Sequence, residues 1–185
     1  MVKKERRVPL SLRTREIIGP PEVVTLINQL VSEVQAKMNL ENLAIIGIRR
    51  RGVELASRIQ KILQKKGIEI PFGTLDITLY RDDLSTVGIH PVVRQTDIPF
   101  DLTGKDILLV DDVLFTGRTI RAALSEIIDF GRPRTVKLLV LIDRDHRELP
   151  IQPDFTGKFM ETKNLQFIEV RLKEIDGEDK ILLME

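Results

Sequence analysis

Short apolar runs alternate along this chain with longer segments whose apolar residues recur at helical spacing. The apolar runs are LAIIGI at 43–48, ILLV at 107–110 and VKLLVLI at 136–142. Helical spacing is found over 20–37, 53–66 and 119–130. Strands buried on both faces and separated by helices are typical of a parallel sheet. The pattern therefore predicts an α/β fold, a doubly wound and mostly parallel sheet with helices on both faces.

The remaining segments fit one domain. Leu75, Ile77 and Leu79 alternate with polar residues, which predicts a strand with one buried face, and 166–170 is a further strand candidate. Residues 81–105 show neither period, so we expect a long, flexible binding loop there. The chain of 185 residues is long enough for a single core. In such sheets, ligands bind beyond the carboxyl ends of the strands.

Composition excludes several functional classes. The chain has no cysteine, which removes thiol chemistry and favours a reducing compartment. Its histidines, His90 and His146, lack a metal-binding spacing. The 29 basic and 28 acidic residues nearly cancel, so net charge does not indicate a nucleic-acid partner. No apolar run approaches membrane-spanning length and the basic amino end is not a secretory signal, so we expect a cytoplasmic protein without membrane contact.

The string ILLVDDVLFTGRT at 107–119 carries the strongest chemical signal. Asp111 and Asp112 end a buried strand, and Thr116–Thr119 lead into a helix, whose amides and positive dipole end suit a phosphate. Paired carboxylates beside a phosphate cradle fit the diol and ester of a ribose 5-phosphate. The alternative is structural, with the acids capping the strand and the threonines satisfying turn amides. The absence of the other common phosphate-loop patterns favours the ligand interpretation.

This string closely resembles the phosphoribosyl pyrophosphate signature of the type I phosphoribosyltransferases. The resemblance implies their fold, with a small hood formed by about 143–170 and the amino-terminal part of the chain. It also implies that Asp111 and Asp112 hold the ribose hydroxyls and that Thr116–Thr119 bind the 5-phosphate. The nucleotide-binding loop would comprise Asp111, Asp112, Val113, Leu114, Phe115, Thr116, Gly117, Arg118 and Thr119.

The donor of that family also carries a diphosphate. The loop after the first apolar run contains Arg49, Arg50, Arg51 and Gly52, which suit a diphosphate because arginine forks onto phosphate oxygens and glycine permits close approach. Taken alone, such arginines are equally typical of a solvated surface. Family members often have a non-proline cis peptide in this loop, and we predict one between Ile48 and Gly52.

The resemblance adds a third catalytic residue and a metal. In this family a long loop closes over the diphosphate and excludes water, which makes Arg81 the candidate that acts with Asp111 and Asp112 in catalysis. The alternative pairs Arg81 with Asp82 or Asp83 on the surface. We expect Mg²⁺ to be held mainly by substrate oxygens, without a dedicated protein site.

Two further features point to the base. Purine enzymes of the family tend to have an acid where this chain has Phe115, so a pyrimidine is favoured. The segment 142–150, with DITLYRDDL and VDDVLFTGRT, closely resembles the bifunctional pyrimidine operon attenuator and uracil phosphoribosyltransferase proteins. This implies that Ile142, Arg144 and His146 bind uracil, although His146 could instead make a turn contact.

That subfamily also binds a messenger leader, with UMP or UTP in the same pocket and a homodimer or larger assembly presenting a basic face. Arg132, Arg134, Arg147 and Lys158 are the candidates for that face. The chain departs from the subfamily pattern, because 16–36 contains no basic residue and Gln152 replaces a basic one. The alternatives are a non-catalytic RNA-binding attenuator on the same fold and a purine phosphoribosyltransferase.

Overall fold

A computed structural model describes residues 13–77, 96–163 and 166–185. Its helices and strands follow one another in the order β1 (Thr14–Ile18), α1 (Pro20–Lys37), β2 (Leu43–Ile48), α2 (Arg51–Gln64), β3 (Phe72–Leu75), β4 (Asp106–Leu114), α3 (Arg118–Phe130), β5 (Thr135–Arg144), β6 (Phe155–Met160), β7 (Phe167–Arg171), α4 (Lys173–Asp176) and β8 (Lys180–Met184).

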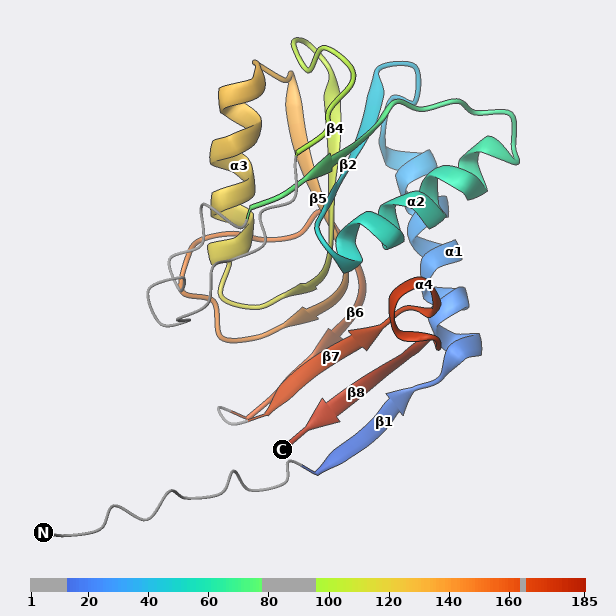
Figure 1. The fold of residues 1–185 in the computed structure, drawn as a ribbon, viewed down its shortest axis with the longest axis vertical. Coiled ribbons are helices and arrows are strands. Elements are labelled where there is room, and N and C mark those ends of the chain that lie inside the picture. Colours follow the sequence, from blue (N-terminus) through green and yellow to red (C-terminus); the bar gives the residue numbers. More distant parts are fainter. Residues whose placement is uncertain (1–12, 78–95, 164–165) are drawn as a thin grey trace, which may run out of the picture.

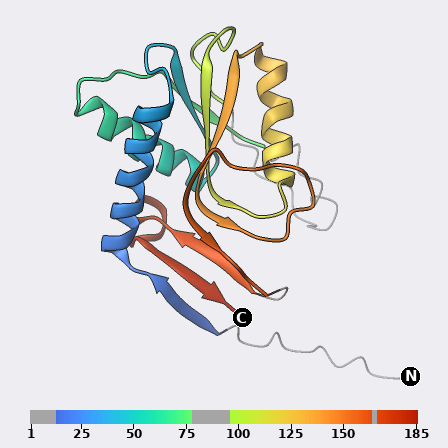
Figure 2. The ribbon, with the colours of Figure 1, turned by 180° about the vertical axis from the view of Figure 1, so that it is seen from behind.

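Five strands form a parallel sheet in the order β3-β2-β4-β5-β6. Helices α1 and α2 cover one face and α3 covers the other, which Figures 1 and 2 show from opposite sides. This arrangement confirms the doubly wound α/β fold. The strand order places β2, β4 and β5 side by side, so the turns that follow them meet at one edge.

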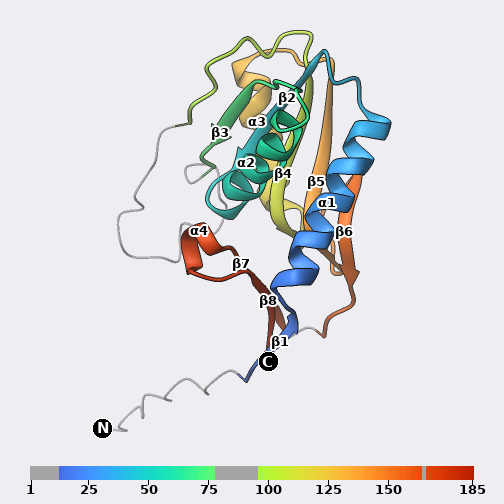
Figure 3. The same cartoon turned by 90° about the vertical axis from the view of Figure 1, so that its right-hand side faces the viewer.

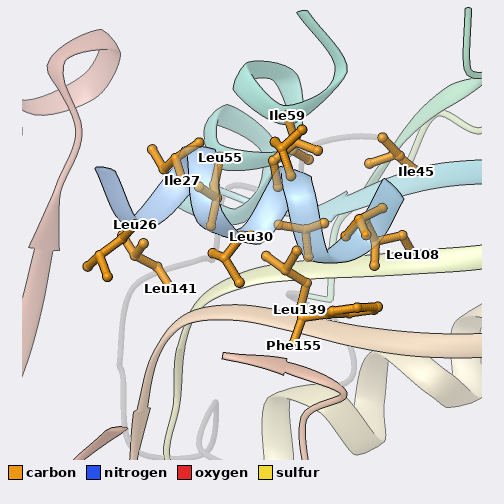
Figure 4. Close-up of a cluster of buried hydrophobic side chains, with 14 of the residues drawn as sticks. Leu26, Ile27, Leu30, Ile45, Leu55, Ile59, Leu108, Leu139, Leu141 and Phe155 are labelled. Atoms are coloured by element: carbon orange, nitrogen blue, oxygen red, sulfur yellow. The ribbon is translucent and has the colours of Figure 1, made fainter. Parts of the chain in front are cut away.

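Alternating residues of the central strands contribute to two apolar clusters, one on each face of the sheet. On one face, Leu30 of α1 and Ile59 of α2 pack toward Leu108 and Leu139 (Figure 4). On the other face, α3 packs onto the neighbouring strand residues through Ile120 and others. Both faces of the strands are therefore covered, which is why they are apolar runs without alternation.

A second sheet of three antiparallel strands, in the order β1-β8-β7, forms the hood. It lies beyond the carboxyl ends of β4 and β5 (Figure 1). We expected the hood to span about 143–170 with amino-terminal contributions. Strand β1 is such a contribution and β7 begins in that range, whereas β8 lies further along the chain. Strand β6 instead pairs with β5 at the edge of the main sheet, and β8 supplies the middle of the hood. The sequence analysis missed β1, β6 and β8.

Two element boundaries differ from expectation near the site. Strand β4 does not stop at Val110 but continues to Leu114, because its pairing with β5 extends to Leu114 and Asp143. Asp111 and Asp112 are therefore strand residues. Strand β3 ends at Leu75 rather than near Leu79, which lies outside the described residues. In the described parts of the chain, no helix is both long enough and apolar enough to span a membrane.

Candidate active site

Three turns meet at the carboxyl edge of the sheet, after β2, β4 and β5. The first two touch closely: a Cβ added at Gly52 would lie 2.5 Å from the Val110 carbonyl oxygen and 3.1 Å from Asp111 Cα. The second and third are joined by hydrogen bonds, in which the amides of Glu148 and Leu149 donate to the Thr116 carbonyl at 3.0 and 3.1 Å. The turns that carry the predicted phosphate, ribose and base residues therefore lie together at this edge.

The turn after β2 carries three arginines with different surroundings. The peptide bond between Arg49 and Arg50 is cis, which confirms the prediction for this loop. Arg49 donates through Nη2 to Thr74 Oγ1 at 3.0 Å, and Arg50 is exposed. Arg51 has a partner that the sequence analysis did not predict, because its guanidinium forms a fork on Asp176 of the hood, with distances of 2.9 and 3.1 Å. The role of the three arginines toward a diphosphate stays a prediction, and Arg49 and Arg50 are its leading candidates.

The two acids at the end of β4 have different environments. Asp111 is buried, and its Oδ1 accepts a hydrogen bond of 3.0 Å from the Asp112 amide. Burial raises the pKa of Asp112, while the charge of Arg51 opposes that rise. Asp112 thus lies in surroundings that disfavour an isolated charge, and polar partners such as ribose hydroxyls would stabilise its carboxylate.

The turn between β4 and α3 has the geometry of an anion site. Gly117 has a φ of 90°, a left-handed conformation that glycine adopts without strain. It caps the amino end of α3, whose first turn contains no acidic residue. The Arg118 amide donates to Thr116 Oγ1 at 3.3 Å, and the Arg118 side chain pairs with Glu148 at 2.6 Å on the exposed side. The amides of the first turn of α3 are thus suited to a phosphate.

An aromatic and cationic platform lies beside this turn. The Arg144 guanidinium carbon is 3.8 Å from the centre of the Phe115 ring, and the His146 ring meets Phe115 edge-on at 6.4 Å and 83°. Arg144 is 3 % exposed and donates to the Gln166 carbonyl at 2.9 Å, and burial lowers its pKa. Among the predicted base residues, Arg144 and His146 come together. Ile142 instead lies in the core of β5.

His146 is held in place by its own contacts. Its backbone φ is 69°, and its Nε2 lies 2.8 Å from the Thr162 carbonyl and 3.3 Å from Asp145. Asp145 in turn accepts from the Thr162 amide and hydroxyl at 3.1 and 2.9 Å. The ring is therefore fixed by the segment before the hood, so the turn contact is present, and the ring also lies edge-on to Phe115.

Arg147 has a structural position that the sequence analysis missed. Its guanidinium is largely buried, pairs with Asp143 and donates to the Phe115 carbonyl at 2.7 Å and the Ile151 carbonyl at 3.0 Å. It also contacts the Arg144 carbonyl. Arg147 therefore joins the turn after β4 to the turn after β5 from inside and does not offer its charge to a surface partner.

The other three candidates for an RNA-binding face are spread over the molecule. Arg132 and Arg134 lie at the opposite edge of the sheet, where Arg134 pairs with Asp106 at the start of β4. Lys158 lies on β6 and pairs with Glu22 of α1 at 2.9 Å. A single protomer does not gather these side chains into one basic patch.

Two further predictions concern Arg81 and a metal ion. Arg81 lies outside the described residues. Within the described ranges, no group of three or more His, Cys, Asp or Glu could hold a metal ion. Asp111 and Asp112 are hard oxygen donors at the site, and they suit a shared role with an ion that is bound mainly by a substrate.

Comparison with known proteins decides the family. Residues 15–175 match the phosphoribosyl transferase domain. The chain belongs to this family. It is 52% identical over 172 residues to the bifunctional protein PyrR of Thermus thermophilus, covering 92% of this chain and 95% of that protein. The PyrR of Deinococcus radiodurans is 47% identical over 171 residues, covering 91% and 93%.

Solved structures agree with the fold. A hypoxanthine phosphoribosyltransferase from Trypanosoma cruzi has a TM-score of 0.70 at 17% identity, covering 92% of this chain and 94% of that chain. A hypoxanthine-guanine-xanthine phosphoribosyltransferase has a TM-score of 0.65 at 16% identity, covering 91% and 92%. The chain is thus a phosphoribosyltransferase, an enzyme of the glycosyltransferase type, and a member of the bifunctional PyrR group within that family.

Proposed function

We propose that this phosphoribosyltransferase joins uracil to phosphoribosyl pyrophosphate, releasing UMP and diphosphate, and that it also regulates pyrimidine genes through a messenger leader. The observation that carries the enzymatic part is the juxtaposition of three features at one edge. These are the acid pair at the end of β4, the amides at the start of α3 and the platform of Phe115, Arg144 and His146.

In this proposal, each group of residues at the site binds a different part of the donor. The amides and hydroxyls of Thr116–Thr119 bind the 5-phosphate, and Asp111 and Asp112 accept hydrogen bonds from the ribose hydroxyls. Arg49 and Arg50 are the candidates that bind the diphosphate, and Arg81 is the candidate that neutralises its charge. N1 of uracil attacks the anomeric carbon, the bond from that carbon to the diphosphate oxygen breaks, and the N1 proton is lost. Holding both reactants at one edge supplies much of the rate enhancement.

Phosphoribosyltransferases generally use Mg²⁺ with their donor, and we propose the same for this chain. The ion neutralises diphosphate charge when it is bound. Asp111 and Asp112 supply the oxygen chemistry that a hard cation prefers, and substrate oxygens and water complete its coordination. The contribution of the protein is to hold these carboxylates beside the ribose.

The base platform supports uracil over a purine. Phe115 and Arg144 offer a flat stacking surface with a buried cation, which suits a small ring with carbonyl acceptors. Steady-state assays should compare uracil, hypoxanthine, guanine and orotate with the donor and Mg²⁺. We expect turnover with uracil to exceed the others by at least about tenfold. Equal or faster turnover with hypoxanthine or guanine would contradict the assignment.

The regulatory part of the proposal rests on membership of the bifunctional PyrR group. Since Arg147 is turned inward and one protomer does not gather Arg132, Arg134 and Lys158, we propose that an assembly of at least two protomers supplies the basic face. UMP or UTP would occupy the enzymatic pocket during binding. A titration of leader RNA at several salt concentrations tests this. The logarithm of the association constant should fall with the logarithm of the salt concentration, with a slope of about 0.7 for each phosphate contacted. The absence of saturable, UMP-dependent binding at low salt would contradict the regulatory part of the proposal and leave only the enzymatic part.

A further inference from the structure

The hood is tied to the start of α2 by an arginine that the sequence analysis assigned to the diphosphate. Arg51 Nε and Nη2 donate to the two carboxylate oxygens of Asp176 at 3.1 and 2.9 Å. Arg51 Nη2 also lies 3.6 Å from Glu169 of β7. Figure 3 shows α4, which carries Asp176, beside the end of α2 that begins with Arg51. Arg51 therefore faces the hood rather than the diphosphate seat.

Asp176 is oriented for this contact by its own backbone. The Leu172 amide donates to Asp176 Oδ2 at 2.9 Å, and the Asp176 amide donates to the Leu172 carbonyl at 2.7 Å. The Asp176 side chain is 16% exposed and the Arg51 side chain 30% exposed. A half-buried pair with bidentate geometry and an oriented carboxylate fixes side-chain position more firmly than an exposed surface pair does.

Arg51 also acts on the ribose seat. Its charge opposes the burial that raises the pKa of Asp112. The next residue, Gly52, packs against Val110 and Asp111 without room for a side chain. Arg51 thus binds the acids of the hood through its side chain, while the residue that follows it in the chain, Gly52, touches the end of β4.

We propose that Asp176 is a positioning residue for donor binding, which acts by holding Arg51 away from Asp112. Without Asp176, the half-buried guanidinium turns to the nearest remaining carboxylates, including Asp112, and competes with the ribose hydroxyls. The proposal rests on the function argued above, since it gives the hood a role at the donor end of the same site. The hood then contributes to donor binding through α4, apart from any contact with the base.

A second ion-pair cluster provides a matched control. Arg58 lies further along α2 and pairs with Asp179 at 2.6 Å and Glu174 at 2.5 Å. Asp179 Oδ1 also accepts from the Lys173 amide at 2.8 Å. This cluster joins the same segment of the hood to the same helix, but within the described parts of the chain the ion pairs of Arg58 are with Glu174 and Asp179 and involve no residue of the donor site. Asp179→Asn therefore weakens the junction without releasing Arg51.

The test compares Asp176→Asn and Asp179→Asn by steady-state kinetics and by calorimetric titration with the donor and Mg²⁺. Asp176→Asn should raise the KM and the dissociation constant for the donor by about tenfold or more, with the KM for uracil changed less than about twofold. Asp179→Asn should leave both donor constants within about twofold. Asp176→Glu should recover part of the loss. Thermal unfolding shows whether the two Asn variants are destabilised to a similar extent.

Three outcomes would overturn the proposal. These are equal donor constants in the two Asn variants, an unchanged constant in Asp176→Asn, and tighter donor binding in Asp176→Asn. The last would mean that Asp176 withholds Arg51 from the diphosphate. If the wild-type protein binds the donor but does not use uracil, the proposed function fails while the titrations still decide the role of Asp176.

Discussion

Replacing Gly52 with alanine should damage the active site far more than the fold. The added Cβ would lie 2.5 Å from the Val110 carbonyl oxygen and 3.3 Å from Asp111 Oδ1. Carbon–oxygen contacts normally begin near about 3.3 Å, so the loop after β2 must move from β4 by about 0.8 Å. Overpacking of this kind costs about 1–3 kcal/mol in stability. A displacement close to 1 Å at a reacting centre costs about 10²-fold in rate.

The assay is kcat/KM for the donor, measured beside thermal unfolding. Gly67→Ala is the matched control, because Gly67 has a φ of 78° and, among the described residues, no atom lies within 4 Å of an added Cβ. Placing a side chain in that conformation costs about 1–2 kcal/mol, similar to the overpacking at Gly52. We expect Gly67→Ala to keep kcat/KM within about twofold of wild type. Comparable activity in the two variants would refute the argument that the loop after β2 and the end of β4 must lie at a fixed distance.

Three further predictions follow from the site and its surroundings. Asp112→Asn should lower kcat by about 10²–10³-fold while thermal unfolding changes little, because it removes a preorganised charge at the ribose, and wild-type turnover would contradict that role. Arg144→Met should raise the KM for uracil more than the KM for the donor. An equal rise in both constants would contradict the assignment of Arg144 to the base. Burial raises the pKa of Glu126, which accepts a hydrogen bond of 2.5 Å from Thr96. The native state then holds this proton more tightly than the unfolded chain, so stability from this group is lost as pH rises through the raised pKa. Glu126→Gln should accordingly raise the melting temperature more at pH 8 than at pH 4, and an equal shift at both pH values would argue against a raised pKa.

The sequence predicts those parts of the molecule whose structure depends on residues that are close together in the chain. The strand β4, the turn at Gly117 and the start of α3 lie within 13 consecutive residues, so their chemistry can be recognised without the rest of the chain. The alternation of apolar runs and helical spacing likewise predicts the parallel sheet, since each strand is buried on both faces and each helix on one.

The hood could not be predicted in the same way, because it joins segments from distant parts of the chain. Strand β1 pairs with β8, with Thr14 opposite Met184. Short strands of mixed composition such as TREII and FTGKFM have too weak a pattern to be separated from loops. The placement of β6 in the main sheet depends on the space left beside β5, which local sequence does not encode.

The roles of individual arginines were also beyond local analysis. Arg51 and Asp176 are 125 positions apart in the sequence, so nothing near Arg51 indicates its partner. Arg147 resembles a surface residue in the segment 142–150, yet the carbonyl groups of two turns and Asp143 enclose it. A charged residue becomes structural when backbone acceptors surround it, and only the folded chain brings those acceptors together.

The central claim is that the turn after β4 binds a phosphorylated ribose. The most direct test is a crystal structure of the protein with phosphoribosyl pyrophosphate and Mg²⁺. We predict that the 5-phosphate lies at the amides of Gly117–Thr119 and that the ribose hydroxyls lie within hydrogen-bond distance of Asp111 and Asp112. Donor density at another place, or no donor density after soaking at millimolar concentration, would contradict the account.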